Sequence, residues 1–488
     1  MKPAQINLKI VVLSLMAFML GAGPLVPLTT ARDGRANPAG SFIVSNLNDS
    51  GTGSLRQTIA DATPGSTINF APGLSGTITL TGGELLIDKD LTIIGPGASV
   101  LTVSGNNTTR VFNIQGRNVS ISGLTIANGN AGNDSGGGIL NDSGRLLMFG
   151  SYIVNNKALN GAGIAIVNSG SADIFATGIM LNNASGDGGG IKLGNSNPNL
   201  VRIDSSTISN NTAGGDGGGI YSHAGAGPLL AGNTTISSNM ATNGAGVYSQ
   251  STTTALFFSG VTNNTATNNG GGVLLPAVSV ANLNSTYIAV NNAPSSGPDV
   301  SGDFLADYSL IGNGSGGNIT GSNNHIGTSV DPINPMITPL QDNGGRTWTH
   351  SPIEGSPMIG AADPNIGLPI DQRNGDRDST PDIGPVEFKI RNPASLEIIS
   401  INPTADPSFI DATIRLTEAS TGLPISFRDI SFAFIRTFGD VDGDGALKPT
   451  DPAGFATGTL KIFGTPVPSG IYADFDGDGN YDSSDLSV

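Results

Sequence analysis

Residues 211–222 read NTAGGDGGGIYS, so that five glycines fall within a dozen consecutive positions. Glycine loses more conformational freedom on folding than any other residue, and a chain that accepts this cost repeatedly has a structural reason for it. A Gly-x-Gly segment followed by Ile or Val recurs with a period of about 27 residues, at 136–139, 161–164, 188–191, 217–220, 244–247 and 270–273. This recurrence predicts a repeat architecture.

Asparagine forms a second marker that keeps step with the glycines. One asparagine is followed by a small or polar residue at a similar place in each repeat, at Asn156, Asn183, Asn211, Asn239, Asn264 and Asn292. Side-chain amides both donate and accept hydrogen bonds. We therefore expect the series to stack as a ladder inside a turn, with each amide bonding the next.

Short apolar and β-branched stretches lie between the two markers. Examples are 146–149 and 201–204, which are too short for helices and predict strands of about four residues, two or three per repeat. A repeat of this length with short strands and glycine corners is typical of one coil of a parallel β-helix, which buries its apolar face only by stacking on its neighbours. Glycine then serves corners where φ is positive or where the next coil leaves no room for a Cβ.

The strands extend on the N-terminal side of the glycine repeats, at 67–70, 76–80, 91–94 and 119–122. We expect the solenoid to begin near Ser41 and to run towards residue 330. Residues 54–62 combine a serine start with apolar helical spacing and predict a short helix that covers the open edge of the first coil.

Composition excludes several classes of function. Charged residues make up 12% of the chain and the net charge is −16, and Lys and Arg form none of the clusters that phosphate binding needs, so no nucleic-acid partner is expected. The balance suits cations or neutral sugars. Cysteine is absent, which excludes a disulfide framework and thiol chemistry.

The N-terminus has the form of a secretory signal peptide. Lys2 and Lys9 precede the apolar run 10–20, and cleavage is expected after 29–31 or 34–36. An uncleaved anchor helix is the alternative. Because no later run is long enough to span a membrane, the mature chain is expected to have no transmembrane helix and to be secreted or held at the cell surface.

Several segments resemble a known group of bacterial proteins: LNDSGTGSLRQTIADA (47–62), residues 91–130, the glycine repeats, PLQDNGGRTWTHSPIEGSPMIGAADP (339–364), DQR (371–373) and DIGPVEF (382–388). They are similar to exported right-handed parallel β-helix proteins with the pectin-lyase-like fold, polymorphic outer-membrane-protein-type repeats and the choice-of-anchor Q domain. The cysteine-containing leader motif often seen in such proteins is missing here. The resemblance implies an all-β fold over 37–388, with an N-terminal cap and a closing segment. It does not imply one activity, because the fold hosts lyases, hydrolases and proteins without known chemistry.

The chain changes character after Phe388. Residues 389–436 are expected to form a linker and a small β-rich spacer, and 437–488 carry DVDGDGALKPTD (440–451) and DFDGDGNYDSSD (474–485). A 12-residue calcium loop supplies oxygens from positions 1, 3, 5, 7, 9 and 12 with Gly at position 6. The predicted Ca²⁺ ligands are Asp440, Asp442, Asp444, the Ala446 carbonyl and Asp451 in the first loop, where position 9 is Lys448, and Asp474, Asp476, Asp478, the Asn480 carbonyl, Asp482 and Asp485 in the second. The alternative is a pair of acidic solvated turns.

The tandem loops resemble a type I dockerin, an EF-hand-like module. That resemblance implies calcium-dependent docking to a cohesin-type scaffold. Gly454 and Gly458 disfavour a helix between the loops, and the chain ends at Val488 without room for a second exit helix. Two alternatives therefore stay open: a truncated chain, or free-standing calcium repeats as in extracellular adhesins or β-propeller-like arrays.

Candidate catalytic residues lie in the glycine repeats. Asp187 and Asp216 each directly precede a glycine triplet, and we expect them one coil apart, at about 5 Å by the strand spacing. Arg202 is the basic candidate, and Lys192 and Asp204 lie nearby in sequence. β-helix lyases and hydrolases need convergent carboxylates. The competing interpretation is a turn position that favours small polar side chains, since other repeats carry Ser135, Asn160, Asn243 and Asn269 there.

Three functions follow. We expect an exported β-helix that binds extracellular polysaccharide, a cell-surface glycan or another surface partner, with calcium-dependent docking through its C-terminal module. A polysaccharide lyase or glycosidase is the first alternative, and a structural surface or stalk protein is the second. The uniform repeats favour the first, because an active site usually interrupts a repeat, whereas convergence of Asp187, Asp216 and a basic side chain would favour the enzyme.

Overall fold

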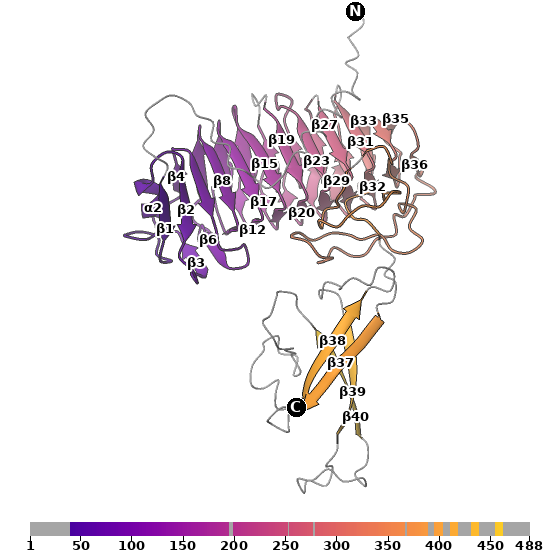
Figure 1. Ribbon diagram of the computed structural model, residues 1–488. Coiled ribbons are helices and arrows are strands. Elements are labelled where there is room, and N and C mark those ends of the chain that lie inside the picture. The colour runs from indigo at the N-terminus through magenta and orange to yellow at the C-terminus, as the bar shows by residue number, and fades with distance from the viewer. Residues whose placement is uncertain are drawn as a thin grey trace, which may run out of the picture. The chain divides into compact units, whose positions relative to one another are not determined.

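The computed structural model describes residues 40–388, apart from 195–198, 252, 277–278 and 367, and four strands closer to the C-terminus. The chain divides into two compact units, Met1–Phe388 and Lys389–Val488, which are described separately. The first unit is a parallel β-helix, as expected from the repeats (Figure 1). Its first strand begins at Ser41 and its last ends at Ile326.

Each complete coil passes through three sheets that extend along the helix, called here sheets 1, 2 and 3. Sheet 1 contains β1 (Ser41–Val44), β2 (Ser66–Phe70), β5 (Leu91–Ile94), β8 (Asn118–Ser122), β11 (Arg145–Phe149), β15 (Ser171–Phe175), β19 (Val201–Asp204), β23 (Leu229–Gly232), β27 (Thr254–Phe257), β31 (Val280–Asn284), β33 (Val300–Asp307) and β35 (Gly317–Thr320). Sheet 2 contains β3 (Gly76–Thr79), β6 (Leu101–Ser104), β9 (Thr125–Ala127), β12 (Tyr152–Val154), β16 (Gly178–Met180), β20 (Thr207–Ser209), β24 (Thr235–Ser237), β28 (Gly260–Thr262), β32 (Tyr287–Ala289), β34 (Leu310–Ile311) and β36 (His325–Ile326).

Sheet 3 contains β4 (Leu85–Ile87), β7 (Phe112–Gln115), β10 (Ile139–Asp142), β14 (Ile164–Val167), β18 (Ile191–Leu193), β22 (Ile220–Ser222), β26 (Val247–Ser249) and β30 (Val273–Leu274), which pairs with β33. A short fourth sheet contains β13 (Lys157–Ala158), β17 (Asn183–Ala184), β21 (Thr212–Ala213), β25 (Met240–Asn243) and β29 (Thr265–Asn269). Within a coil the order is sheet 3, sheet 1, sheet 2 and the short sheet, and the glycine segment then returns the chain to sheet 3. The strands predicted at 91–94 and 201–204 coincide with β5 and β19.

The core consists of aligned columns of identical or similar side chains. Ile139, Ile164, Ile191 and Ile220 pair in register from coil to coil, continue into Val247, and are fully buried. Burying such a side chain contributes about 1.5–3 kcal/mol. Since one coil cannot bury this face alone, the repeats stabilise one another by stacking.

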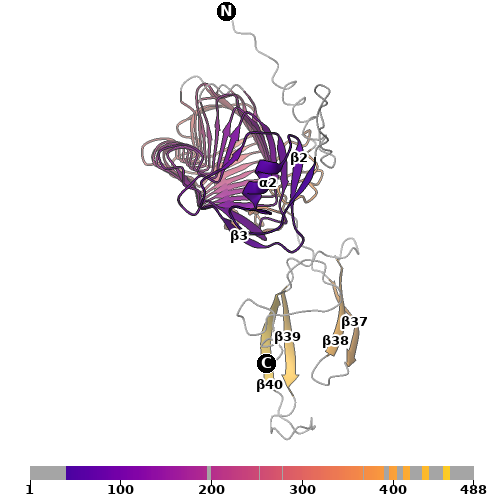
Figure 2. The same cartoon turned by 90° about the vertical axis from the view of Figure 1, so that its left-hand side faces the viewer.

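The predicted helix is α2 (Leu55–Asp61), and it lies at the N-terminal end of the β-helix (Figure 2). Ser54 caps it by accepting a hydrogen bond from the backbone N–H of Gln57. Leu55 and Ile59 are buried in the same hydrophobic cluster as the first coils. The helix therefore covers apolar surface that the first coil would otherwise expose.

The glycine and asparagine positions of the repeat lie in contact with each other. The first glycine of each triplet has a positive φ, for example 69° at Gly217, a conformation that other residues rarely adopt. The third glycine leaves room for the next coil: a Cβ on Gly219 would lie 2.6 Å from the carbonyl oxygen of Gly246 and 3.1 Å from the Nδ2 of Asn239. The middle position is Gly or Ala.

The asparagine ladder exists and is buried. Its rungs are Asn156, Asn182, Asn211, Asn239, Asn264 and Asn291, and each Nδ2 donates to the Oδ1 of the next rung at 2.9–3.0 Å. The last amide donates to the Oδ1 of Asp299 at 2.9 Å. The rungs predicted at Asn183 and Asn292 were wrong by one residue, because both of these asparagines are exposed while their predecessors are buried.

Residues 327–388, called here the closing segment, pack against sheet 2 and its flanking turns. Gln372 anchors it: its Nε2 donates to the Ser206 carbonyl at 3.0 Å and its Oε1 accepts from Thr235 Oγ1 at 2.7 Å. Met358 and Ile383 are buried in a second hydrophobic cluster together with Tyr287 of β32. The closing segment thus covers the apolar outer surface of the last coils.

Buried ion pairs connect residues within the closing segment. Arg377 and Glu387 form an ion pair at 3.2 Å, with side chains only 2% and 1% exposed. Arg373 pairs with fully buried Asp371 at 2.7 Å. The Arg377 guanidinium also lies 4.3 Å from the ring centre of Phe258, which follows β27. Burial lowers the pKa of Arg377, and the carboxylates of Glu387 and Asp371 oppose that shift.

The second unit contains two antiparallel strand pairs, β37 (Ser395–Pro403) with β38 (Ile410–Thr417) and β39 (Ser431–Phe438) with β40 (Gly454–Lys461). Part of the expected linker is therefore strand β37. The predicted calcium ligands and residues 1–36 lie outside the described residues. No helix in the described part of the chain is both long and apolar enough to cross a membrane.

Candidate functional site

A row of polar side chains marks the turn that leads into sheet 3. Backbone pairing aligns the same position in successive coils, occupied by Ser135, Asn160, Asp187, Asp216, Asn243, Asn269 and Ser296. The glycine after each residue turns the chain inward, which leaves the preceding side chain at the edge of sheet 3. The structure therefore places Asp187 and Asp216 in consecutive coils.

A second row stands on the outer face of sheet 3. In-register pairing aligns Lys192 of β18, Tyr221 of β22 and Tyr248 of β26. The two tyrosine rings stack with centres 5.3 Å apart and planes within 6° of parallel, and the Lys192 ammonium lies 5.0 Å from the Tyr221 ring centre. Together with Asp187 and Asp216, these three residues form what is called here the Tyr248 face.

Hydrogen bonds join the two rows. Lys192 Nζ contacts Asp187 Oδ2 at 3.1 Å and Asn160 Oδ1 at 2.9 Å. Asp187 Oδ1 accepts from the backbone N–H of Asp216 at 3.2 Å, and Asp216 Oδ1 accepts from Asn243 Nδ2 at 2.8 Å. Each carboxylate thus accepts a hydrogen bond from the following coil. Lys192 contacts Asp187 directly and is linked to Asp216 through it.

The face changes the acidity of its groups. Burial raises the pKa of Asp216, and the charge of Asp187 adds to this shift, while hydrogen bonds from Asn243 and Tyr248 oppose it. Burial, followed by the charge of Asp187, raises the pKa of Tyr221 to about 12. Both tyrosines therefore stay neutral hydroxyl donors at ordinary pH.

The arrangement allows two kinds of chemistry. Carboxylate, amide, ammonium and phenol groups in a row present donors and acceptors for hydroxyl groups, and Tyr248 is half-buried with its hydroxyl on the same face as the carboxylates. Stacked coils lie about 4.8 Å apart, close to the separation of about 5–5.5 Å between the carboxyl groups of retaining glycosidases. The Tyr221 ring lies between Lys192 and Tyr248, so a ligand meets the edge and hydroxyl of that ring.

The third candidate, Arg202, lies elsewhere. It belongs to β19 of sheet 1, where it pairs with Asp173 at 2.7 Å and lies over the Phe175 ring. Burial raises the pKa of neighbouring Asp204 to about 6. The basic residue that the structure brings to the Asp187–Asp216 pair is Lys192.

Within residues 40–388, excluding the short gaps in the description, no three His, Asp or Glu side chains gather as a set able to hold a metal ion. The Ca²⁺ ligands predicted from sequence all belong to the C-terminal loops, outside the described residues.

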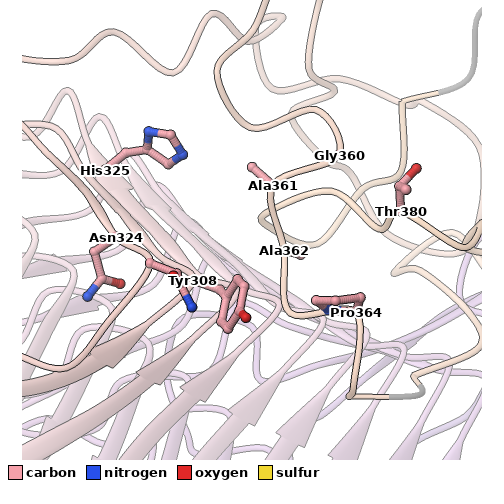
Figure 3. Close-up of a pocket in the computed structure, with 9 residues that line it drawn as sticks. Tyr308, Asn324, His325, Gly360, Ala361, Ala362, Pro364 and Thr380 are labelled. Atoms are coloured by element: carbon pink, nitrogen blue, oxygen red, sulfur yellow. The ribbon is translucent and has the colours of Figure 1, made fainter.

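Two hollows lie away from the Tyr248 face. One of about 470 Å³ lies between the last coils and the closing segment; Tyr308 and His325 stand on one side and Ala361 and Pro364 on the other (Figure 3). The other, of about 360 Å³, is lined by Glu84, Arg110 and Asp134, in which the arginine bonds both carboxylates at 2.5 and 2.6 Å. Neither hollow includes a residue of the Tyr248 face.

Sequence reasoning missed Tyr221 and Tyr248 as site residues. The available signal was their position directly after the buried Ile220 and Val247, because alternation in a strand turns the next side chain outward. Aligning the repeats at that position would have placed both tyrosines beside Lys192.

Comparisons with known proteins add little beyond this geometry. No protein-family model matches the sequence, and no curated protein does either. Among solved structures, the crystal structure of pectate lyase Pel9A aligns with a TM-score of 0.42 and 13% sequence identity, over 72% of this chain and 96% of that one.

Proposed function

We propose that the β-helix binds an extracellular polysaccharide along the Tyr248 face. The observation that carries this proposal is the alignment of Asp187, Asp216, Lys192 and Tyr248 on consecutive coils of one outer surface. A polysaccharide is a regular row of hydroxyl groups, and a stack of coils repeats donors and acceptors in one direction. Side chains held by a rigid stacked core lose little further entropy on binding.

A panel of soluble polysaccharides in affinity gel electrophoresis of the mature chain tests binding. At least one polymer is expected to retard the protein, and Tyr248→Ala is expected to weaken that retardation about tenfold or more, as loss of a central aromatic contact does. Tyr308→Ala, the same change at the hollow near the closing segment, serves as the matched control. Equal loss in both variants, or no retardation of the wild type by any polymer, would refute the proposal.

A second candidate is glycoside hydrolysis at the same face. It is favoured by the one-coil spacing of Asp187 and Asp216 and by the raised pKa of Asp216. In this scheme Asp216 protonates the departing glycosidic oxygen, and the Asp187 carboxylate forms a bond to the anomeric carbon that water later cleaves. Lys192 holds Asp187 in place.

Release of reducing ends from the polymer that binds tests this candidate. Turnover that Asp216→Asn lowers by about a hundredfold or more, with retardation in the gel retained, would make the protein an enzyme. Retardation without reducing ends, measured over days with folded protein, leaves a binding protein.

We also propose that the C-terminal loops bind Ca²⁺ and dock the protein to an extracellular partner, after export directed by residues 1–36. The support is the ligand spacing of 440–451 and 474–485. The strand β40 occupies 454–461 between the loops, which favours free-standing calcium repeats over a dockerin. Calorimetric titration of the full mature chain with Ca²⁺ is expected to show binding at two loops, and Asp474→Ala with Asp478→Ala is expected to remove the share of the second loop. An unchanged titration would refute the proposal.

A further inference from the structure

The two partly or fully buried cations along the edge of sheet 3, Lys192 and Arg110, are already paired with carboxylates. Lys192 is 17% exposed and is held by Asp187 and Asn160. Asp216 adds a second carboxylate without a second cation. The face therefore carries more negative than positive charge.

The same excess continues along the turns towards the N-terminal end of sheet 3. Arg110, just before β7, has a side chain only 6% exposed and bonds both Glu84 and Asp134. Its guanidinium also donates to the carbonyl oxygens of Ser135 and Gly136. A ligand lying along these coils meets the carboxylates of Glu84 and Asp134 on either side of Arg110, whose guanidinium is already bonded to both of them and to two backbone carbonyls.

An exposed cation does occur close to Asn160. Lys157 of β13 is exposed and stands three residues before Asn160. One solvated lysine gives a modest attraction that salt screens. A polymer with a carboxylate on every sugar would bring several negative charges to the Tyr248 face, where two carboxylates, Asp187 and Asp216, stand beside one lysine, Lys192.

A bridging metal ion is the other way to hold an anionic sugar on an acidic surface. In residues 40–388, leaving aside the undescribed gaps, no set of three carboxylate or histidine side chains gathers for such an ion. The carboxylate of Asp187 is instead bound to Lys192 and to the backbone N–H of Asp216, and that of Asp216 is bound to Asn243. The side chains on this face thus favour uncharged hydroxyl groups.

We infer that the Tyr248 face selects an uncharged polysaccharide and rejects polyuronates, an inference that rests on the proposed carbohydrate binding. Asp187 is the residue that sets this selectivity, because its carboxylate occupies the lysine that an anionic sugar would otherwise approach. Like charges placed opposite each other across an interface suppress the wrong partner.

Affinity electrophoresis with galactomannan, xyloglucan, β-glucan and polygalacturonate separates the outcomes. One of the neutral polymers is expected to retard the mature protein by nearly the same amount at about 0.02 M and about 0.5 M NaCl, since screening acts on charge pairs. Polygalacturonate is expected to cause no retardation in chelator or in Ca²⁺. Asp187→Asn is expected to raise polygalacturonate binding at low salt at least about threefold by freeing Lys192.

Asp303→Asn, on β33, is the matched control, because it changes net charge equally at an exposed site on another strand. Polygalacturonate retardation of the wild type that Tyr248→Ala removes would overturn the inference while leaving carbohydrate binding intact. Equal gains in both aspartate variants would also overturn it. Absence of retardation by every polymer would refute the proposed function itself.

Discussion

Gly219 shows how one missing Cβ supports the fold. Its place in the triplet is the point where the next coil and the amide of Asn239 approach the backbone. The glycine segments therefore serve two needs at neighbouring positions: a left-handed corner at the first residue and close approach of backbone at the third. This answers why the chain tolerates so many glycines.

Gly219→Ala is expected to lower the free energy of unfolding by about 1–3 kcal/mol, the usual cost of overpacking a tight interior. Gly375→Ala is the control, because there a Cβ would lie 3.4 Å or more from its neighbours, and a change within about 0.5 kcal/mol is expected. Denaturant titration of both variants measures the difference. Equal losses would show that the close approach at Gly219 is not limiting.

Asp299 ends the asparagine ladder with a charge. It is 3% exposed and accepts hydrogen bonds from Asn291 and from the backbone N–H of Asn313 at 2.7 Å. Burial raises its pKa to about 6, against these hydrogen bonds. Because the folded chain holds this proton more tightly than the unfolded chain, the stability contributed by Asp299 is present at low pH and is lost as pH rises from about 4 to 6.

Wild type is therefore expected to gain stability relative to Asp299→Asn as the pH falls from 7 to 4, by on the order of 2 kcal/mol. Thermal unfolding of both proteins across this range measures the difference, and subtraction removes the titration of all other groups. A difference that stays constant with pH, or that shrinks on acidification, would contradict the account.

The asparagine ladder was predicted from the sequence, but two of its rungs were assigned to the neighbouring asparagine. Period and composition predicted stacked amides, but where two asparagines are adjacent, as at Asn182 and Asn183, composition does not say which one points inward. Counting from the buried strand residue does: each rung lies three positions after it, as Asn182 follows Ile179. The residue directly before the rung has a positive φ, 59° at Leu181, which turns the rung into the coil.

Asn182→Ala is expected to lower the free energy of unfolding by about 2–3 kcal/mol, since it leaves the Nδ2 of Asn156 and two backbone groups without their partners in a buried site. Asn183→Ala, the exposed neighbour on β17, is expected to cost less than about 0.5 kcal/mol. Chemical denaturation compares the two. A larger loss at Asn183 would restore the original assignment of the rung.

At the scale of the whole molecule, the β-helix was predictable because its determinants are local and repeated. The start at Ser41, the capping helix and the strands follow from alternation and period. The closing segment was expected only through resemblance, because its docking rests on single contacts between distant residues, such as Gln372 with Ser206. Such contacts leave no repeated pattern in the sequence.

The candidate site was predictable in part for the same reason. The glycine period placed Asp187 and Asp216 one coil apart, since the repeat fixes the register. Arg202 was chosen by nearness in sequence, yet one coil carries the chain through several sheets, so a neighbour in sequence lies on another surface. Lys192 and the tyrosines share the surface because they share a register position.

Hydroxyl-radical footprinting of the protein with and without the polysaccharide that retards it most tests the central claim directly. Mass spectrometry then reports which side chains the ligand shields. We predict lower oxidation of Tyr248, with Tyr308 and His325 of the last coils and Trp348 of the closing segment unchanged. Protection of Tyr308 and His325 with Tyr248 unchanged would place the ligand in the hollow of Figure 3 and contradict the account.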